Sequence, residues 1–406
     1  MNMLPDSPRR PLRRFAIYIA ISASLNLAVW VLLLLPRYLA NLGWGPEPIG
    51  WTVSVYFFTN LFAQLLFGAL VQKWGVRRIA IVGSAAGTVG GILYMLVPLW
   101  LPALWIARAL HGVGTGLVFV AAFTQLIQTE PRHLRGKAIG YFGVPGFLMM
   151  GLGPSLADWL VLSYGYLTVF AVVFLCFAPL LLWYGLRQEQ REAPPETSHR
   201  LGWKITLKQD GLMRVLVLAV FFGFSFSCWM TFLAPALAHL PGAIGVFGIG
   251  YAAGALVSRF TLTGQFANSA RRWLAVGALV LYGAATGAIP WAASLSQVAI
   301  LACVAGLIHG TYYPALSVVA AERFHPQWQG QGLALYAASQ TLGLFLGPPA
   351  WGLVSGLAGL KPAFLLAGGI LIVSTIFFLV REIFFRPSDA SQPEPKSPRY
   401  QLTAPR

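Results

Sequence analysis

The sequence predicts an all-α membrane protein of twelve transmembrane helices, arranged as two pseudo-symmetric six-helix bundles. Hydrophobic residues make up 57% of the 406 residues and charged residues only 10%, whereas an average soluble domain has about 25% charged residues. The few Asp and Glu lie almost entirely between long apolar blocks, each close to the roughly 20 residues that one helical span requires. The same short motifs also recur in both halves of the chain.

Twelve apolar blocks are long enough to be spans. Their expected bounds are 15–38, 49–71, 79–98, 102–126, 138–161, 166–186, 212–237, 243–265, 273–293, 296–320, 332–357 and 362–381. The first block follows four arginines, as the apolar core of a signal peptide would. However, its charge-free run of 21 residues, from Phe15 to Leu35, is longer than such a core, and no A-x-A cleavage site follows. We therefore expect it to remain in place as the first span.

The hydrophilic stretches divide the chain into five parts. We expect a cytoplasmic N-terminal segment at 1–14, an N-terminal six-helix bundle at 15–186, a cytoplasmic linker at 187–211, a C-terminal six-helix bundle at 212–381 and a disordered cytoplasmic tail at 382–406. The tail is polar and rich in proline, a composition typical of disorder.

The basic residues predict the orientation in a cell inner (cytoplasmic) membrane. With the N-terminus inside, 24 of the 28 Lys and Arg fall in cytoplasmic segments, and only Arg37 and Lys361 fall outside. Such an excess of basic residues marks the cytoplasmic side, so both termini are expected there. A net charge of +16 would also suit nucleic-acid binding. Nucleic-acid-binding domains, however, gather their basic residues on a soluble face, so no nucleic-acid partner is expected.

Three motif pairs indicate that the two halves are repeats. The pairs are Gly68 with Arg77 and Arg78 against Gly264 with Arg271 and Arg272, His111-Gly112 against His309-Gly310, and Gly153-Pro154 against Gly347-Pro348. Their offsets are 196, 198 and 194 residues. Repeats of this kind allow two halves to rock about a central solute site.

These motifs resemble those of the major facilitator superfamily (MFS) over nearly the whole chain outside the two tails. The segment 68–78 resembles that family's signature between spans 2 and 3, 108–114 its span 4 motif, and 143–154 the span 5 motif of the drug and metabolite efflux branch. The resemblance implies the MFS fold and alternating access. One departure concerns the gate, because the signature's Asp is replaced by Gln72 and, in the second half, by Asn268.

Several residues are candidates for gating or hinge motion. Gly68 permits close helix approach, and the Arg77-Arg78 pair can bind the carbonyl end of a helix. Gly153-Pro154 and Gly347-Pro348 can loosen spans 5 and 11. The alternative is that glycine and proline are simply frequent in membrane helices.

Polar groups inside the apolar blocks are the candidate solute-binding residues, because ionisable residues are costly in lipid. They are Arg108, His111 and Thr115 on one face of span 4; Tyr56, Asn60 and Gln64 on span 2; Asn26 and Trp30 on span 1; Thr231 on span 7; and His309 and Tyr313 on span 10. Three alternatives stay open. Arg108 can cap carbonyl groups, the histidines can be packing residues, and the other polar groups can join helices.

The coupling ion is less well defined, because no Asp or Glu lies in the middle of an expected span. If protons drive transport, the groups that titrate should be His111, His309 or Asp158, since histidine is poised near neutral pH. If none of them titrates, the protein is an uncoupled facilitator. The net positive charge inside the spans favours an anionic or zwitterionic solute.

The sequence thus predicts a monomeric secondary transporter that moves a small organic solute across the lipid bilayer. Efflux is implied by the span 5 resemblance. The alternative from another class is a non-transporting membrane receptor or assembly factor.

An enzyme is not expected, because no nucleophile–base pair or metal cluster is visible, and neither a metal nor a cofactor is expected. Cys176, Cys228 and Cys303 lie in apolar blocks without metal-ligand spacing.

Overall fold

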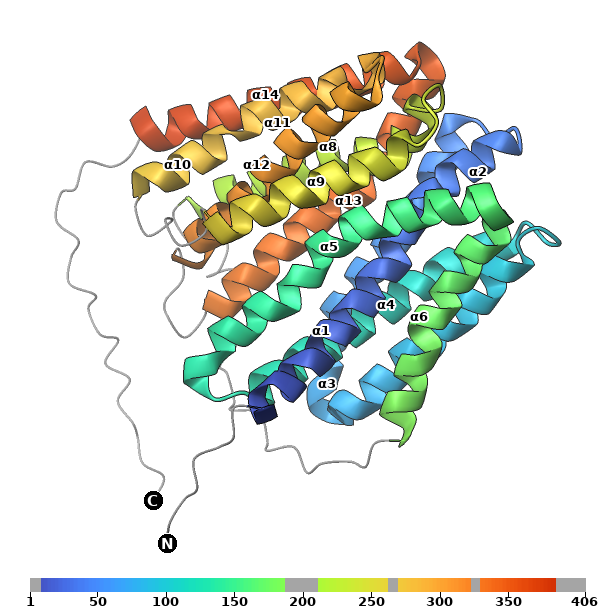
Figure 1. Cartoon of the computed structure of the whole chain (residues 1–406). Helices are drawn as coiled ribbons and strands as arrows, with labels where there is room; N and C mark the ends of the chain where they lie inside the picture. The colour runs from blue at the N-terminus through green and yellow to red at the C-terminus, as the bar shows by residue number, and fades with distance from the viewer. Residues whose placement is uncertain (1–8, 187–210, 262–268, 323–328, 385–406) are drawn as a thin grey trace, which may run out of the picture.

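The computed structural model describes residues 9–186, 211–261, 269–322 and 329–384. Within these ranges the chain forms helices joined by short turns (Figure 1). The N-terminal half holds α1 (Arg9–Trp30), η1 (Val31–Leu34), α2 (Leu35–Asn41), α3 (Pro46–Leu96), α4 (Ala103–Thr129), α5 (Arg132–Tyr164) and α6 (Tyr166–Leu186). The C-terminal half holds α8 (Leu212–Ala236), α9 (Ala243–Thr261), α10 (Ser269–Gly277), α11 (Leu279–Ala288), η3 (Ile289–Trp291), α12 (Leu295–Glu322), α13 (Gln329–Ala358) and α14 (Leu360–Phe384).

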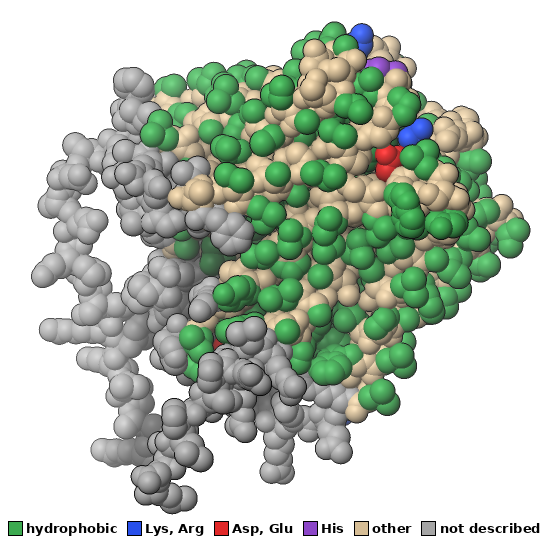
Figure 2. All heavy atoms as spheres, in the orientation of Figure 1, with side chains coloured by type: hydrophobic (Ala, Val, Ile, Leu, Met, Phe, Trp, Pro, Cys, Tyr) green, Lys and Arg blue, Asp and Glu red, His purple; other side chains and the backbone are tan. Residues whose placement is uncertain are grey.

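The predicted membrane fold is confirmed. Eleven helical stretches of the described residues are long and apolar enough to cross a membrane, and the remaining expected span is the shorter apolar stretch Ala243–Arg259 of α9. Figure 2 shows a face covered mainly by hydrophobic side chains, with charged groups at its edge. The chain is therefore a multi-pass membrane protein.

Three spans differ in detail from the expected continuous helices. The first span is interrupted by the 3₁₀ turn η1. This turn lies just before Pro36, which has no N–H to donate to the carbonyl of Leu32 four residues earlier. Spans 2 and 3 form the single stretch α3, which turns at Gly75 with φ of 77°, a backbone region open mainly to glycine. The ninth span is divided between α10 and α11. The first helix also begins at Arg9, before the expected residue 15.

Two of the three motif pairs occupy equivalent places in the two halves, and Gly264 of the third pair lies outside the described residues. A Cβ on Gly112 of α4 would meet the Tyr56 carbonyl of α3, and a Cβ on Gly310 of α12 would meet the Ala255 carbonyl of α9. Gly153 of α5 packs in the same way on α1, and Gly347 of α13 packs on α8. Each of these two motifs therefore supplies the close approach of one helix pair, and the equivalent helix pair recurs in the other half.

The two halves meet most closely at one end of the molecule, where the short connections between helices lie (upper right in Figure 1). We call it the short-loop end. There α3 packs on α13, and α5 packs on α9. Ser54 Oγ donates a hydrogen bond of 2.6 Å to the Phe345 carbonyl, and Ser155 Oγ lies 3.1 Å from the Gly245 carbonyl. The halves are therefore closed against each other at the short-loop end.

Candidate solute-binding site

Arg108 is buried between spans 2 and 4 of the N-terminal half, with 5% of its surface exposed. Its Nε donates to the Thr52 carbonyl at 3.1 Å and its Nη2 to the Val53 carbonyl at 2.9 Å. The guanidinium carbon also lies 5.0 Å from the centre of the Tyr56 ring. In this conformation Arg108 is therefore engaged by α3, in the carbonyl-capping arrangement that the sequence left open.

His111 is fully enclosed one turn further along α4. Its ring packs against Tyr56, Tyr94 and Phe177, with ring centres 4.8, 5.9 and 5.7 Å away. The Tyr94 hydroxyl lies 3.4 Å from Nδ1, while Nε2 has no hydrogen-bond partner among the described residues. All of these neighbours belong to the N-terminal half, so His111 lies inside one bundle.

The polar stripe on span 2 also faces its own half. Asn60 Nδ2 donates to the Gly112 carbonyl at 3.3 Å, and Gln64 Nε2 donates to Asn60 Oδ1 at 2.7 Å. Asn26 Nδ2 and the Thr115 hydroxyl donate to carbonyls four residues earlier in their own helices. In this conformation these groups therefore join helices or satisfy their own backbone.

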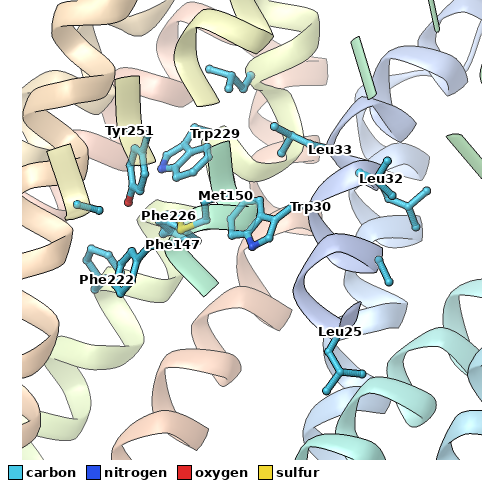
Figure 3. Packing of buried hydrophobic residues seen from close by; sticks show 14 of the residues in the cluster. Leu25, Trp30, Leu32, Leu33, Phe147, Met150, Phe222, Phe226, Trp229 and Tyr251 are labelled. Atoms are coloured by element: carbon cyan, nitrogen blue, oxygen red, sulfur yellow. The ribbon is translucent and has the colours of Figure 1, made fainter. Parts of the chain in front are cut away.

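A group of aromatic rings lies where the two halves meet, near the middle of their helices. We call it the aromatic cluster; its members are Trp30, Phe147, Phe222, Phe226, Trp229, Tyr251 and His309. Figure 3 shows Trp30 reaching towards Trp229 and Phe226. The rings of Trp30 and Trp229 stack at 6.2 Å, and Phe147 meets His309 edge-on at 5.6 Å. Trp30 and Phe147 come from the N-terminal half, so the cluster spans the interface.

A chain of hydrogen bonds runs behind the cluster in the C-terminal half. Trp229 Nε1 donates to the Tyr282 hydroxyl at 2.8 Å, which lies 3.4 Å from the Tyr251 hydroxyl. The Tyr251 hydroxyl in turn bonds His309 Nδ1. Tyr251 and Tyr56 are 195 residues apart, so the repeat places a tyrosine beside each of the two histidines.

Charged groups flank the cluster on both sides. The Arg259 guanidinium carbon lies 5.4 Å from the centre of the Phe147 ring, a cation–π contact between the halves. Towards the short-loop end, Asp158 is 4.0 Å from Arg37. The Tyr313 ring contacts His309 edge-on and lies tilted against Tyr336. The Thr231 hydroxyl is buried without a hydrogen-bond partner among the described residues.

The sequence reasoning missed most of this cluster. It named Trp30 and His309 but not the rings of α8, although Phe222, Phe226 and Trp229 follow the i, i+4, i+7 spacing of one helix face. That spacing is also normal for a packed core, so periodicity alone does not distinguish a binding face from a buried one.

The gating candidates lie at both ends of the molecule. Arg77 donates to the Tyr184 and Gly185 carbonyls at 3.0 and 2.7 Å, at the end of α6, and Arg78 is exposed. Gly68 and Gln72 lie in α3, while Asn268 lies outside the described residues. Pro154 and Pro348 sit inside the continuous helices α5 and α13.

The tandem prolines of α13 leave one backbone carbonyl of this helix available to accept a hydrogen bond from the other half. Pro349 has no N–H to bond the Phe345 carbonyl four residues earlier, and Ser54 supplies the missing donor across the interface. We expect Ser54→Ala to lower the equilibrium constant for closure at the short-loop end about fivefold, and with it the closed population, since one hydrogen bond contributes roughly 1 kcal/mol. Distances between spin labels on the two halves measure that population. Ser374→Ala, which removes a bond within α14, should leave it unchanged.

No group of three or more His, Cys, Asp or Glu in the described part of the chain could hold a metal ion.

Comparison with known proteins gives a family match along the chain. The family model described as Major Facilitator Superfamily matches residues 15–268 and 233–405. Similar proteins include the major facilitator superfamily multidrug transporter mfsC of Aspergillus fumigatus, 31% identical over 141 residues, which are 34% of this chain and 27% of the relative. Multidrug resistance protein MdtL of Shigella flexneri is 27% identical over 168 residues, which are 41% of this chain and 42% of the relative. These matches therefore span less than half of the relatives' own lengths.

Solved structures share the fold at low sequence identity. A bacterial homologue of the human lysosomal transporter Spinster, inward-facing and unoccupied, has a TM-score of 0.73 and 16% identity, covering 92% of this chain and 97% of its own. The nucleoside transporter NupG has a TM-score of 0.71 and 13% identity, covering 90% and 99%.

Proposed function

Because the chain belongs to the Major Facilitator Superfamily and is a membrane transporter rather than an enzyme, we propose that it exports a small organic solute with aromatic character by alternating access. The aromatic cluster carries this proposal. Rings from both halves close on each other near the middle of their helices, where a solute bound between the halves would replace ring–ring contacts with its own. Relatives named as a multidrug transporter and as a multidrug resistance protein support the outward direction.

The charge of the site supports an anionic or zwitterionic solute. Two arginine side chains within the apolar blocks, Arg108 of α4 and Arg259 in the last turn of α9, are cationic. Because Arg108 is engaged by carbonyl groups of α3, the preference rests on Arg259, which lies against Phe147. A positive charge at low dielectric attracts an anionic group and disfavours an organic cation.

The proposed orientation has both termini in the cytoplasm of the inner membrane, as the basic residues indicate. The closed short-loop end then faces outwards. For proton coupling, His309 and Asp158 are better candidates than His111, which is enclosed within one bundle. The second candidate is an uncoupled facilitator, favoured because Asp158 lies towards the end of its span, beside Arg37.

Transport by reconstituted protein tests the proposal. Proteoliposomes with an imposed pH gradient are loaded with fluorescent aromatic anions, neutral dyes and cations, and flux is followed for each. We expect Trp30→Ala and Phe147→Ala each to reduce flux about tenfold, since an aromatic contact contributes roughly 0.5–1.5 kcal/mol beyond the area it buries. Cys303→Ala, at an exposed position on α12, should retain full flux.

The outcomes separate the candidate functions. Flux that collapses when the pH gradient is removed supports proton coupling, and flux that only follows the solute gradient supports a facilitator. Absence of flux for every solute, from protein that is folded and inserted, would favour the non-transporting receptor or assembly factor.

A further inference from the structure

The two symmetry-related histidines differ in their surroundings. His111 is 0% exposed, and its Nε2 is enclosed without a partner among the described residues. His309 keeps 7% of its surface exposed, and one of its ring neighbours, Phe147, belongs to the opposite half. His111 therefore lies inside one bundle, whereas His309 lies at the interface between the two halves.

The direction of the hydrogen-bond chain behind His309 is set by Trp229. An indole N–H can only donate, so the Tyr282 hydroxyl oxygen accepts from Trp229 Nε1. The Tyr282 proton is buried and needs an acceptor. Among the described residues, the acceptor recorded beside it is the Tyr251 hydroxyl oxygen. Tyr282 therefore donates to Tyr251.

The same reasoning fixes the tautomer of His309. With its oxygen accepting from Tyr282, the Tyr251 hydroxyl directs its own proton at His309 Nδ1. A neutral imidazole has one donor and one acceptor nitrogen, so Nδ1 is the acceptor and Nε2 carries the proton. The reverse direction would leave the buried Tyr282 proton without an acceptor.

We propose that His309 presents its Nε2–H as a hydrogen-bond donor to the solute, so the transporter selects aromatic solutes that carry a carbonyl or carboxylate oxygen beside the ring. This inference rests on the proposed function, since it names the solute class of the same site. The ring of the solute would lie among Trp30, Phe226 and Trp229. Its oxygen would accept from Nε2, and a donor fixed by three buried residues discriminates against a solute that lacks the acceptor.

The tautomer is tested without any solute. Full-length protein labelled with ¹⁵N-histidine in nanodiscs gives imidazole nitrogen shifts that separate the Nδ1–H and Nε2–H forms, and His309→Gln identifies the His309 signals by their loss. We expect the Nε2–H form with a hydrogen-bonded Nδ1. Tyr251→Phe removes the donor and should shift the Nδ1 signal. A protonated Nδ1 in the wild-type protein would overturn the inference.

The solute class is tested with three probes that share one ring system: 2-naphthamide, 2-naphthoate and 2-methylnaphthalene. Binding is measured by calorimetry on the protein in nanodiscs, with empty nanodiscs as the blank. We expect the two oxygen-bearing probes to bind about tenfold more tightly than 2-methylnaphthalene, the discrimination of about one hydrogen bond. His309→Phe should reduce the preference for the uncharged 2-naphthamide to about twofold or less, whereas His309→Gln, whose amide N–H₂ replaces the Nε2 donor, should retain it.

Each result bears on a different statement. A preference for 2-naphthamide that is unchanged in His309→Phe, or no binding of any probe, would overturn the assigned solute class. Tight, His309-dependent binding without flux in proteoliposomes would leave the binding inference standing and reject the export proposal. Cys303→Ala should match the wild type in every measurement.

Discussion

Gly151→Trp should abolish solute flux, with a decrease of about a hundredfold or more, while the protein still folds and inserts. Gly151 of α5 faces the other half at the short-loop end. Even a Cβ at this position would lie 2.6 Å from the Ala252 Cβ and 2.8 Å from the Gly248 carbonyl oxygen. An indole ring cannot fit there, so the closed arrangement at this end becomes inaccessible. A carrier held open at one end cannot complete an alternating cycle.

Pulsed electron resonance distances would show the block directly. One label at Tyr164 and another at Leu295 report the separation of the halves, because both residues are exposed beside the short connections. We expect a single long distance in Gly151→Trp and a shorter distance in the parent protein. Gly356→Trp is the matched control, since a Cβ there meets nothing within 4 Å. A short distance in Gly151→Trp, or normal flux, would contradict closure of the two halves around Gly151 at the short-loop end.

The membrane fold could be predicted because lipid imposes simple demands on a sequence. A spanning helix must be long and apolar, and these demands located the helices to within a few residues at most ends. The kink at Gly75 and the 3₁₀ turn before Pro36 are set by single residues and local geometry. Hydropathy averages over a whole window, so it does not resolve such features.

The site could be predicted only in part. Helical periodicity indicates which side chains share one face of a helix, but not which other helix that face contacts. The stripe with Asn60 and Gln64 was expected to line a cavity, yet in this conformation Asn60 bonds the Gly112 carbonyl of its own half. His111 and His309 are equivalent in the repeat, but their surroundings differ because different aromatic residues contact them. Phe147 of α5 joins the α8 rings through His309 of α12, which both Phe147 and Phe226 contact when the two halves meet.

The second large effect is expected at Arg108. Arg108→Met should lower the unfolding free energy by roughly 3 kcal/mol, because two charge-assisted hydrogen bonds and a cation–π contact are lost from a buried position. Arg108→Lys should recover less than half of this, since an ammonium group lacks the planar fork that reaches two adjacent carbonyls. Thermal unfolding in detergent, with Arg78→Met as the exposed control, measures the change.

These variants also decide what Arg108 does for transport. If it bound the solute in the cycle, Arg108→Lys would keep stability and lose affinity for 2-naphthoate. The contacts favour a positioning role. Arg108 holds the carbonyls of Thr52 and Val53, and the next residue, Ser54, makes the hydrogen bond to α13 that joins the halves. Arg108→Lys should therefore lengthen the Tyr164–Leu295 distance as Ser54→Ala does. The combination of both variants should add little, because both act on the same contact.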